Sequence, residues 1–401
     1  MKELSLTHKI VFALLCVAAF TNTFTLAAHV TLIRVVLPVV LCILLFTERV
    51  RLDSSFYVVC SFFFTYITYT LLVTLCYGRP VALPDIANFL FILLMVTATM
   101  WFFCAAPRDS LKILYWVCCA NLVVSLVLAT LEMSFGWHLP MSNINLPDKV
   151  MIVAEHNKNF PTGFFHNKND FAIVVALTFC YLLAYRVHFI QNRKKWVDWV
   201  FLALCLAVLY MVKCRTAMVA VVIFLLFTQR QKLLKHKVFF GITGTVFLIG
   251  VVVTFFFVRA TSTSIRSNLY LYSFASLFDS YGLGFGLGGD RYYFAGLDNF
   301  DLFESITNTH SYLMEFLLTS GIFFFVGYLL MLFYLMRRMA RTKGRNEFWF
   351  MIPLYVFLLF SPSTASCLWI HYVFLGAIVG SMLMPDSCKT IEENGLYAVD
   401  R

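Results

Sequence analysis

The stretch "SFYVVCSFFFTYITYTLLVTLC", residues 55–76, decides the fold, because it carries no charged side chain over a length sufficient to cross a bilayer. A second apolar run, 84–105, follows a short break that contains glycine and proline. The whole chain of 401 residues is 61% hydrophobic and 13% charged, with a mean hydropathy of +0.82. This composition predicts an all-α polytopic membrane protein, since a transmembrane barrel would show short alternating segments instead.

Apolar runs of this kind recur along the chain and predict about twelve transmembrane helices. The amino-terminal run resembles a signal peptide but has no convincing cleavage site, so we interpret it as a retained first helix. The predicted spans are 10–28, 31–46, 55–76, 84–105, 111–132, 170–188, 197–213, 215–228, 238–258, 310–336, 348–361 and 365–384.

The distribution of positive charge predicts the orientation of these spans. With the N-terminus in the cytoplasm, most Lys and Arg residues fall in cytoplasmic segments, which is the usual bias. Both termini are then cytoplasmic, and the two longest loops, 133–169 and 259–309, lie on the same outer side, the second between the ninth and tenth spans. Long loops often carry function. We therefore expect one integral membrane domain, 1–384, with its site in these loops, and a cytoplasmic tail, 385–401.

Cysteine usage and net charge favour neither a metal centre nor a nucleic-acid partner. The 12 cysteines fall mostly inside apolar runs, where Cys behaves as a small hydrophobe, and none forms a C-x-x-C pair. No cluster of carboxylates suggests a bound metal, and no cofactor is expected. The net charge of +10 fits basic cytoplasmic loops of a membrane protein rather than nucleic-acid binding.

The first outer loop ends in a polar segment, "FPTGFFHNKNDF", residues 160–171, placed directly before an apolar span. His166, Asn167 and Asn169 are candidate substrate-binding residues. Two interpretations of the asparagines stay open: they shape a binding site, or they cap the following helix, where Asn is favoured.

Two cations, Lys213 and Arg215, lie between apolar stretches at the predicted outer boundary. A cation in that position is costly unless it snorkels, pairs or faces a cavity. Snorkelling is the better interpretation for Lys213. For Arg215, which is followed at once by another span, a role in binding is favoured.

The second outer loop contains Arg266 within "SIRSNLYLYSFASLF", a segment typical of a helix lying on the membrane surface. A lipid-headgroup contact and a substrate contact are equally compatible with Arg266. The turn that follows, with Gly284, Gly286 and Gly289, fits G-x-G-x-x-G. It lacks the strand and helix of a dinucleotide site, so we expect a flexible turn whose backbone approaches a ligand.

His310 begins the long apolar run 310–336, with Asn308 and Thr309 before it as candidate caps, and Glu315 lies slightly deeper. A single histidine at a helix start is usually structural, but histidine is also the usual general base near neutral pH. Glu315 is a candidate substrate contact or a counter-charge for an arginine. Two arginines and a histidine on one membrane face suggest a lipid phosphate or pyrophosphate ligand.

The order of these motifs resembles the O-antigen ligase and polymerase superfamily of bacterial surface-glycan enzymes. The resemblance rests on "GFFHNKNDFA" (163–172), "CRTAMVA" (214–220), the Arg266 segment with its glycine-rich turn, and "NTHSYLMEFLLTSG" (308–321). Where the family often has a His-Asn pair, this chain has His310 followed by Ser311, so a role for an Asn side chain there is in doubt.

The resemblance implies a metal-independent glycosyltransferase of the bacterial plasma membrane with an extracytoplasmic active site. Its donor would be an undecaprenyl-pyrophosphate-linked glycan and its acceptor a second glycan or a lipid, with a flippase and a chain-length regulator as further partners. Arg215 and Arg266 would hold the pyrophosphate and His310 would serve the acceptor. The motif style favours a polymerase over an O-antigen ligase, and the one-sided polar residues disfavour a lipid-linked glycan flippase.

Overall fold

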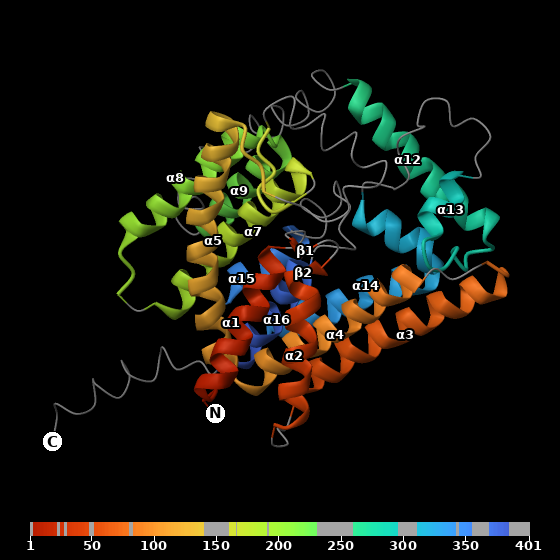
Figure 1. Cartoon of the computed structure of the whole chain (residues 1–401), viewed down its shortest axis with the longest axis horizontal. Coiled ribbons are helices and arrows are strands. Elements are labelled where there is room, and N and C mark those ends of the chain that lie inside the picture. The colour runs from red at the N-terminus through yellow and green to blue at the C-terminus, as the bar shows by residue number, and fades with distance from the viewer. Residues whose placement is uncertain are drawn as a thin grey trace.

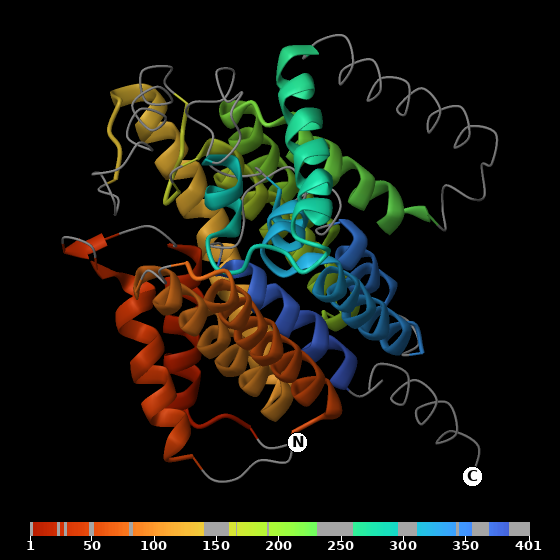
Figure 2. The ribbon, with the colours of Figure 1, turned by 90° about the vertical axis from the view of Figure 1, so that its right-hand side faces the viewer.

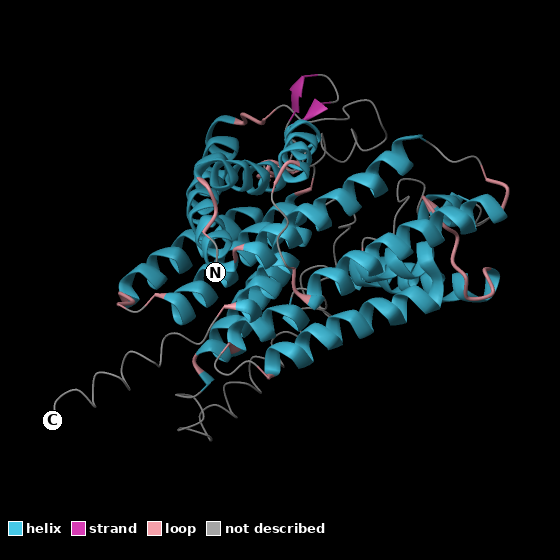
Figure 3. Ribbon diagram, turned by 90° about the horizontal axis from the view of Figure 1, so that it is seen from below, coloured by secondary structure: helices cyan, strands magenta, loops and turns pink. Residues whose placement is uncertain are grey.

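The structure is a computed structural model of the chain, and it describes residues 3–21, 25–27, 30–47, 52–79, 83–139, 160–165, 167–190, 192–230, 260–295, 311–341, 345–354 and 369–384. Helix makes up nearly all of this part of the chain (Figure 3). Turns and loops connect the helices, and one short antiparallel pair of strands is present in the described residues, β1 (Thr25–Ala27) and β2 (Val30–Thr31). The prediction of an all-α membrane protein is confirmed.

Among the described residues, six helices are long and apolar enough to cross a membrane. They are α3 (Ser54–Cys76), α4 (Leu83–Ala105), α5 (Pro107–Phe135), α7 (Lys168–Phe189), α8 (Lys195–Val212) and α14 (Tyr312–Ala340). The shorter apolar helices are α1 (Leu6–Phe20), α2 (Leu32–Leu45), α9 (Arg215–Thr228) and α16 (Ile370–Leu383), and α15 (Asn346–Pro353) precedes α16. The total of twelve spans stays a prediction, because 238–258 lies outside the described residues.

The described part of the predicted outer loop 259–309 contains two helices, α12 (Ala260–Asp279) and α13 (Gly289–Ala295). The prediction of a helix around Arg266 is therefore confirmed. In Figure 1, α12 and α13 lie at the upper right, above the ends of α3 and α14, while α5, α7, α8 and α9 form a group at the upper left.

The centre of the molecule is formed by α7 and α16. In the most apolar window of α7, 83% of the residues are buried, against 28% in α8. Nearly every residue of α16 is buried, and Figure 2 shows this helix in the middle of the bundle. Polar contacts fix α7 against α5, because the Tyr181 hydroxyl donates to the carbonyl of Leu111 at 2.7 Å. An apolar helix with no polar face is typical of a bundle centre.

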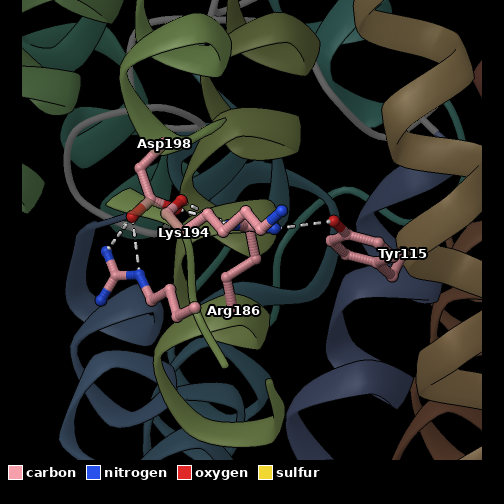
Figure 4. A network of polar contacts seen from close by, with 5 residues as sticks. Tyr115, Arg186, Lys194 and Asp198 are labelled. Carbon is pink, nitrogen blue, oxygen red and sulfur yellow. Dashed lines mark hydrogen bonds and ion pairs between the residues drawn. The ribbon is translucent and has the colours of Figure 1, made fainter. Parts of the chain in front are cut away.

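A network of charges joins α5, α7 and α8 at the end of α7 opposite to Lys168 (Figure 4). Arg186 donates to Asp198 at 2.7 Å, to the Tyr115 hydroxyl at 3.3 Å and to the carbonyl of Lys194 at 3.0 Å. Arg193 donates to the other oxygen of Asp198 at 2.6 Å. The two arginines therefore share one carboxylate, which holds the α7–α8 connection in place.

At the limits that the structure describes, three predicted spans differ from the helices by three or more residues, one of them 111–132, which is α5 (Pro107–Phe135). The first helix was expected at 10–28, but it ends at Phe20, where Thr21 forms the C-cap and the strand pair follows. The span 310–336 was expected as one helix starting at His310. Helix α14 starts at Tyr312, and Gly321 interrupts it with non-helical backbone, φ 69° and ψ −172°.

Candidate functional site

The polar segment 160–165 is held by a buried carboxylate at the end of α5. Glu132 is 1% exposed and accepts hydrogen bonds from the backbone N–H groups of Thr162, at 2.6 Å, and Gly163, at 2.9 Å. His138 Nδ1 lies 3.1 Å from the same carboxylate. A buried carboxyl group is tolerated where hydrogen bonds satisfy it, so Glu132 fixes the conformation of this segment.

Glycine is required at position 163 for two reasons. Its φ is +57°, in the left-handed region, and a Cβ there would lie 2.7 Å from the ring of Phe171. Phe171 also stacks on Phe165, with ring centroids 6.2 Å apart. The segment therefore packs directly on the first turn of α7.

Asn167 forms the N-cap of α7. Its backbone is extended, and its side-chain oxygen accepts from the N–H of Asn169 at 2.7 Å. Of the two interpretations left open for the asparagines, capping is confirmed for Asn167. Asn169 lies in the first turn and is half-buried, and a role of either residue in sugar binding stays a prediction. His166 lies outside the described residues.

Lys213 and Arg215 form the corner between α8 and α9. Lys213 is the C-cap of α8 in the left-handed conformation, with φ 57°, and Cys214 is the N-cap of α9. Non-glycine residues adopt this conformation infrequently. Arg215 is the first residue of α9, and both cations are exposed. The partial positive charge of a helix N-terminus adds to that of Arg215 and favours an anion there.

An aromatic ring connects this corner to the polar segment. The Lys213 ammonium lies 5.3 Å from the ring centroid of Phe160, and the Lys168 ammonium lies 3.3 Å from the same centroid. Both contacts are within the range of a cation–π interaction. The structure therefore brings Lys213, at the corner that Arg215 shares, to the segment that leads into the Asn167 cap of α7.

The second half of the predicted site is described only in part. Arg266 lies on α12, and its side chain lies outside the described residues, as does His310. Ser311 is the N-cap of α14, and its hydroxyl accepts from the N–H of Met314 at 3.4 Å. Glu315 follows in the first turn of α14 and is half-buried. The convergence of Arg266, His310 and Glu315 on Arg215 therefore stays a prediction.

The backbone N–H groups of the glycine-rich turn form hydrogen bonds to the backbone of α14. The N–H groups of Phe285 and Gly286 donate to the carbonyls of Leu318 and Thr319, both at 2.8 Å. A Cβ at Gly284 would lie 2.4 Å from the backbone nitrogen of Gly321. The predicted close approach of backbone is present, and for this glycine its partner is the break in α14; an approach of the turn to a ligand stays a prediction.

The same turn also contacts α3. The N–H of Leu287 donates to the Thr74 hydroxyl at 2.7 Å, and a Cβ at Gly286 would lie 2.2 Å from that hydroxyl oxygen. The Tyr69 hydroxyl donates to the carbonyl of Leu283 at 2.9 Å. The turn thus satisfies the carbonyls released where α14 breaks and fixes α12 and α13 over the end of α3.

Within the described ranges, no group of three or more His, Cys, Asp or Glu side chains is arranged to hold a metal ion.

Glu132 was not identified from the sequence. It stands alone near the end of a long apolar span, and an intramembrane carboxylate is the signal that would have marked it.

Comparison with known proteins gives one informative similarity. No family model matches the chain. The chain is similar to the teichuronic acid biosynthesis protein TuaE of Bacillus subtilis (strain 168), with 23% identity over 295 residues. The match covers 64% of this chain and 59% of TuaE, so the chain spans less than two thirds of the relative's length. What the structure and this comparison establish together is an all-α membrane protein similar to a protein of polysaccharide biosynthesis.

Proposed function

We propose that the chain is a metal-independent glycosyltransferase that extends a surface polysaccharide from a polyprenyl-pyrophosphate-linked oligosaccharide. The observation that carries the proposal is the approach of Lys168 and Lys213 to the ring of Phe160, in the segment 160–165, with Arg215 at the start of α9, two residues after Lys213. The similarity to a teichuronic acid biosynthesis protein supports a role in polysaccharide assembly.

This arrangement suits a pyrophosphate because the exposed Lys213 ammonium lies over the Phe160 ring, and a ring attracts a cation without cancelling its formal charge. Arg215 is exposed at the start of α9, where its guanidinium offers two parallel donors to phosphate oxygens. Arg266 is the second arginine that we assign to the pyrophosphate.

The orientation follows from the charge distribution. The loops 133–169 and 259–309 would lie outside the bacterial plasma membrane, and the basic network around Arg186 and Arg193 would lie in the cytoplasm, as would both termini. The site would therefore meet the lipid-linked donor on the outer face of the membrane.

In the proposed reaction, an acceptor hydroxyl attacks the anomeric carbon of the donor sugar. The new glycosidic C–O bond forms as the bond between that carbon and the pyrophosphate oxygen breaks. His310 takes the hydroxyl proton, and the arginines stabilise the negative charge on the departing polyprenyl pyrophosphate. The glycan is thereby transferred to the acceptor oxygen, and polyprenyl pyrophosphate is released.

The test is an extension assay with purified protein and a lipid-linked oligosaccharide, analysed by mass spectrometry. A polymerase produces lipid-linked chains of increasing length together with free polyprenyl pyrophosphate. Transfer only when a lipid or other envelope acceptor is added would identify a ligase. Movement of the intact lipid-linked glycan across vesicles without formation of a glycosidic bond would contradict the enzyme proposal.

A further inference from the structure

A further arginine, Arg79, lies at the end of α3, beside the glycine-rich turn. Helix α3 ends at Cys76, with Tyr77 as its C-cap and Gly78 at φ +63°. The N–H of Arg79 then donates to the carbonyl of Thr74 at 3.3 Å. This glycine-based helix ending fixes the backbone at Arg79 and directs the chain away from the helix axis.

The Arg79 side chain lies on two aromatic rings. Its guanidinium carbon is 4.3 Å from the ring centroid of Tyr292, on α13, and 5.9 Å from that of Tyr77. Tyr77 in turn stacks on Phe285 of the glycine-rich turn, with centroids 5.8 Å apart. The turn is itself hydrogen-bonded to α3 through Leu287, so the guanidinium plane is held by a rigid surround.

Within the described residues, the Nε–Nη2 edge of this guanidinium has no protein partner. Nε and Nη2 of Arg79 are both buried and have no hydrogen-bond acceptor in the part of the chain that the structure describes. Asp279 of α12, an acidic residue of the same region, accepts instead from the hydroxyl of Tyr293 at 2.9 Å. Burial lowers the pKa of Arg79, although Tyr292 and Tyr77 act in the opposite direction. A buried N–H without an acceptor costs free energy that a bound anion would recover.

The geometry of the free edge indicates the ligand. Nε and Nη2 donate along parallel directions and match two oxygens of one oxyanion. Tyr77 and Tyr292 are 40% and 54% exposed, and tyrosine is typical of the interface between membrane and water. The oxyanion most abundant at such an interface is a lipid phosphate.

We propose that the Nε–Nη2 edge of Arg79 binds the phosphate group of a lipid at the outer face of the plasma membrane. This lipid is either the polyprenyl-linked donor or an anionic phospholipid, and both present the same phosphate chemistry. The proposal rests on the proposed function only for the outward orientation of residue 79, and it does not depend on the transfer reaction.

The first test uses the unaltered full-length protein in a non-ionic detergent. Phenylglyoxal, which modifies guanidinium groups, is added with undecaprenyl pyrophosphate, with phosphatidylglycerol, or with neither, and the rate of modification at each arginine is followed by mass spectrometry. Arg108, an exposed residue at the start of α5, is the internal control. We expect either phosphate lipid to slow modification of Arg79 at least roughly tenfold, the size of one charge-assisted hydrogen bond, and to leave Arg108 unchanged.

The two lipid arms identify the source. Protection by undecaprenyl pyrophosphate alone assigns Arg79 to the donor, and protection by both lipids assigns it to lipid phosphate in general. Equal modification of Arg79 in all three samples would overturn the proposal. If Arg79 is protected in a protein that shows no transfer, only the proposed function fails. Normal transfer with an unprotected Arg79 refutes the Arg79 site alone.

The second test separates binding from packing. Arg79→Lys keeps the charge but loses the two-donor edge, so affinity for the protecting lipid should fall roughly ten- to a hundredfold. Tyr292→Phe keeps the ring and should bind like wild type, whereas Tyr292→Ala should weaken binding. Arg108→Lys is the matched control. Wild-type affinity in Arg79→Lys would mean that the arginine only packs on the rings, and the proposal would be wrong.

Discussion

The ammonium of Lys213 lies 5.3 Å from the ring centroid of Phe160, so the corner between α8 and α9 is joined to the segment before α7 by a cation–π contact. Lys168 approaches the same ring from the first turn of α7. Lys213 was expected to snorkel, and it is exposed, but its charged end has a defined aromatic partner. Arg215 lies two residues after Lys213, at the same corner between α8 and α9.

Replacing this ring tests its role in positioning the cations. Phe160→Leu removes the cation–π contacts and should weaken donor binding roughly two- to fivefold, the equivalent of about 0.5–1 kcal/mol. Phe160→Tyr keeps the π face and should bind like wild type. Phe323→Leu, at an exposed position on α14, is the control, and donor binding to purified protein is the measurement. Equal affinities for Phe160→Leu and wild type would show that the ring does not position the lysines.

Glu132 should stabilise the segment 160–165 through the hydrogen bonds that it accepts from Thr162 and Gly163. Glu132→Gln leaves a single acceptor oxygen for two N–H groups, so the free energy of unfolding should fall by about 1–3 kcal/mol. Hydrogen exchange at Thr162 and Gly163 should become faster. Thr130→Val, on the same helix, is the control. Unchanged exchange at both amides would refute the anchoring role.

The break in α14 depends on Gly321. A Cβ at this position would lie 2.2 Å from the carbonyl oxygen of Gly282, and the φ of +69° disfavours other residues. Gly321→Ala should therefore cost about 2–4 kcal/mol of stability, measured by thermal unfolding in detergent. Gly327→Ala lies in the regular part of the same helix, where a Cβ would meet Phe62 at 3.4 Å. It should be neutral or stabilising by up to about 1 kcal/mol, and equal losses in the two variants would contradict this explanation.

Much of the fold could be predicted from hydrophobicity alone, because lipid contact imposes long apolar runs. Helix α3 begins and ends within a residue of its predicted limits, and α9 matches them. The break at Gly321 could not be predicted in this way. Its cause is contact with residues 282 and 283, which lie far away in the sequence, and glycine is tolerated within apolar helices.

For the site, the sequence indicated which residues are polar but not what they contact. Asn167 has the capping role that was one of its two interpretations, because a cap depends only on its neighbours. The role of Glu132 could not be predicted, because the N–H groups that donate to its carboxyl oxygens belong to Thr162 and Gly163, about thirty residues later. Arg79 was not identified from the sequence, since its stacking on Tyr292 requires α13 to fold over α3.

The arginines assigned to pyrophosphate should not tolerate lysine. Arg215→Lys and Arg266→Lys keep the charge but lose the paired donors, so the rate of transfer should fall roughly 10²–10³-fold. Arg337→Lys, at an exposed position near the other end of α14, is the control. Addition of EDTA should leave the wild-type rate unchanged. Full activity in either lysine variant, with normal folding, would show that this arginine does not bind the pyrophosphate and only contacts lipid headgroups.

The most direct test of the central claim is glycan extension by His310→Ala, measured beside donor binding on the same purified protein. If His310 takes the proton of the acceptor hydroxyl, the variant should bind the lipid-linked donor like wild type and extend it roughly 10²–10⁴-fold more slowly. Partial recovery in His310→Gln would indicate that orientation by a hydrogen bond contributes to the rate. Near-normal extension by His310→Ala would contradict the account and leave only a lipid-phosphate site lined by cations.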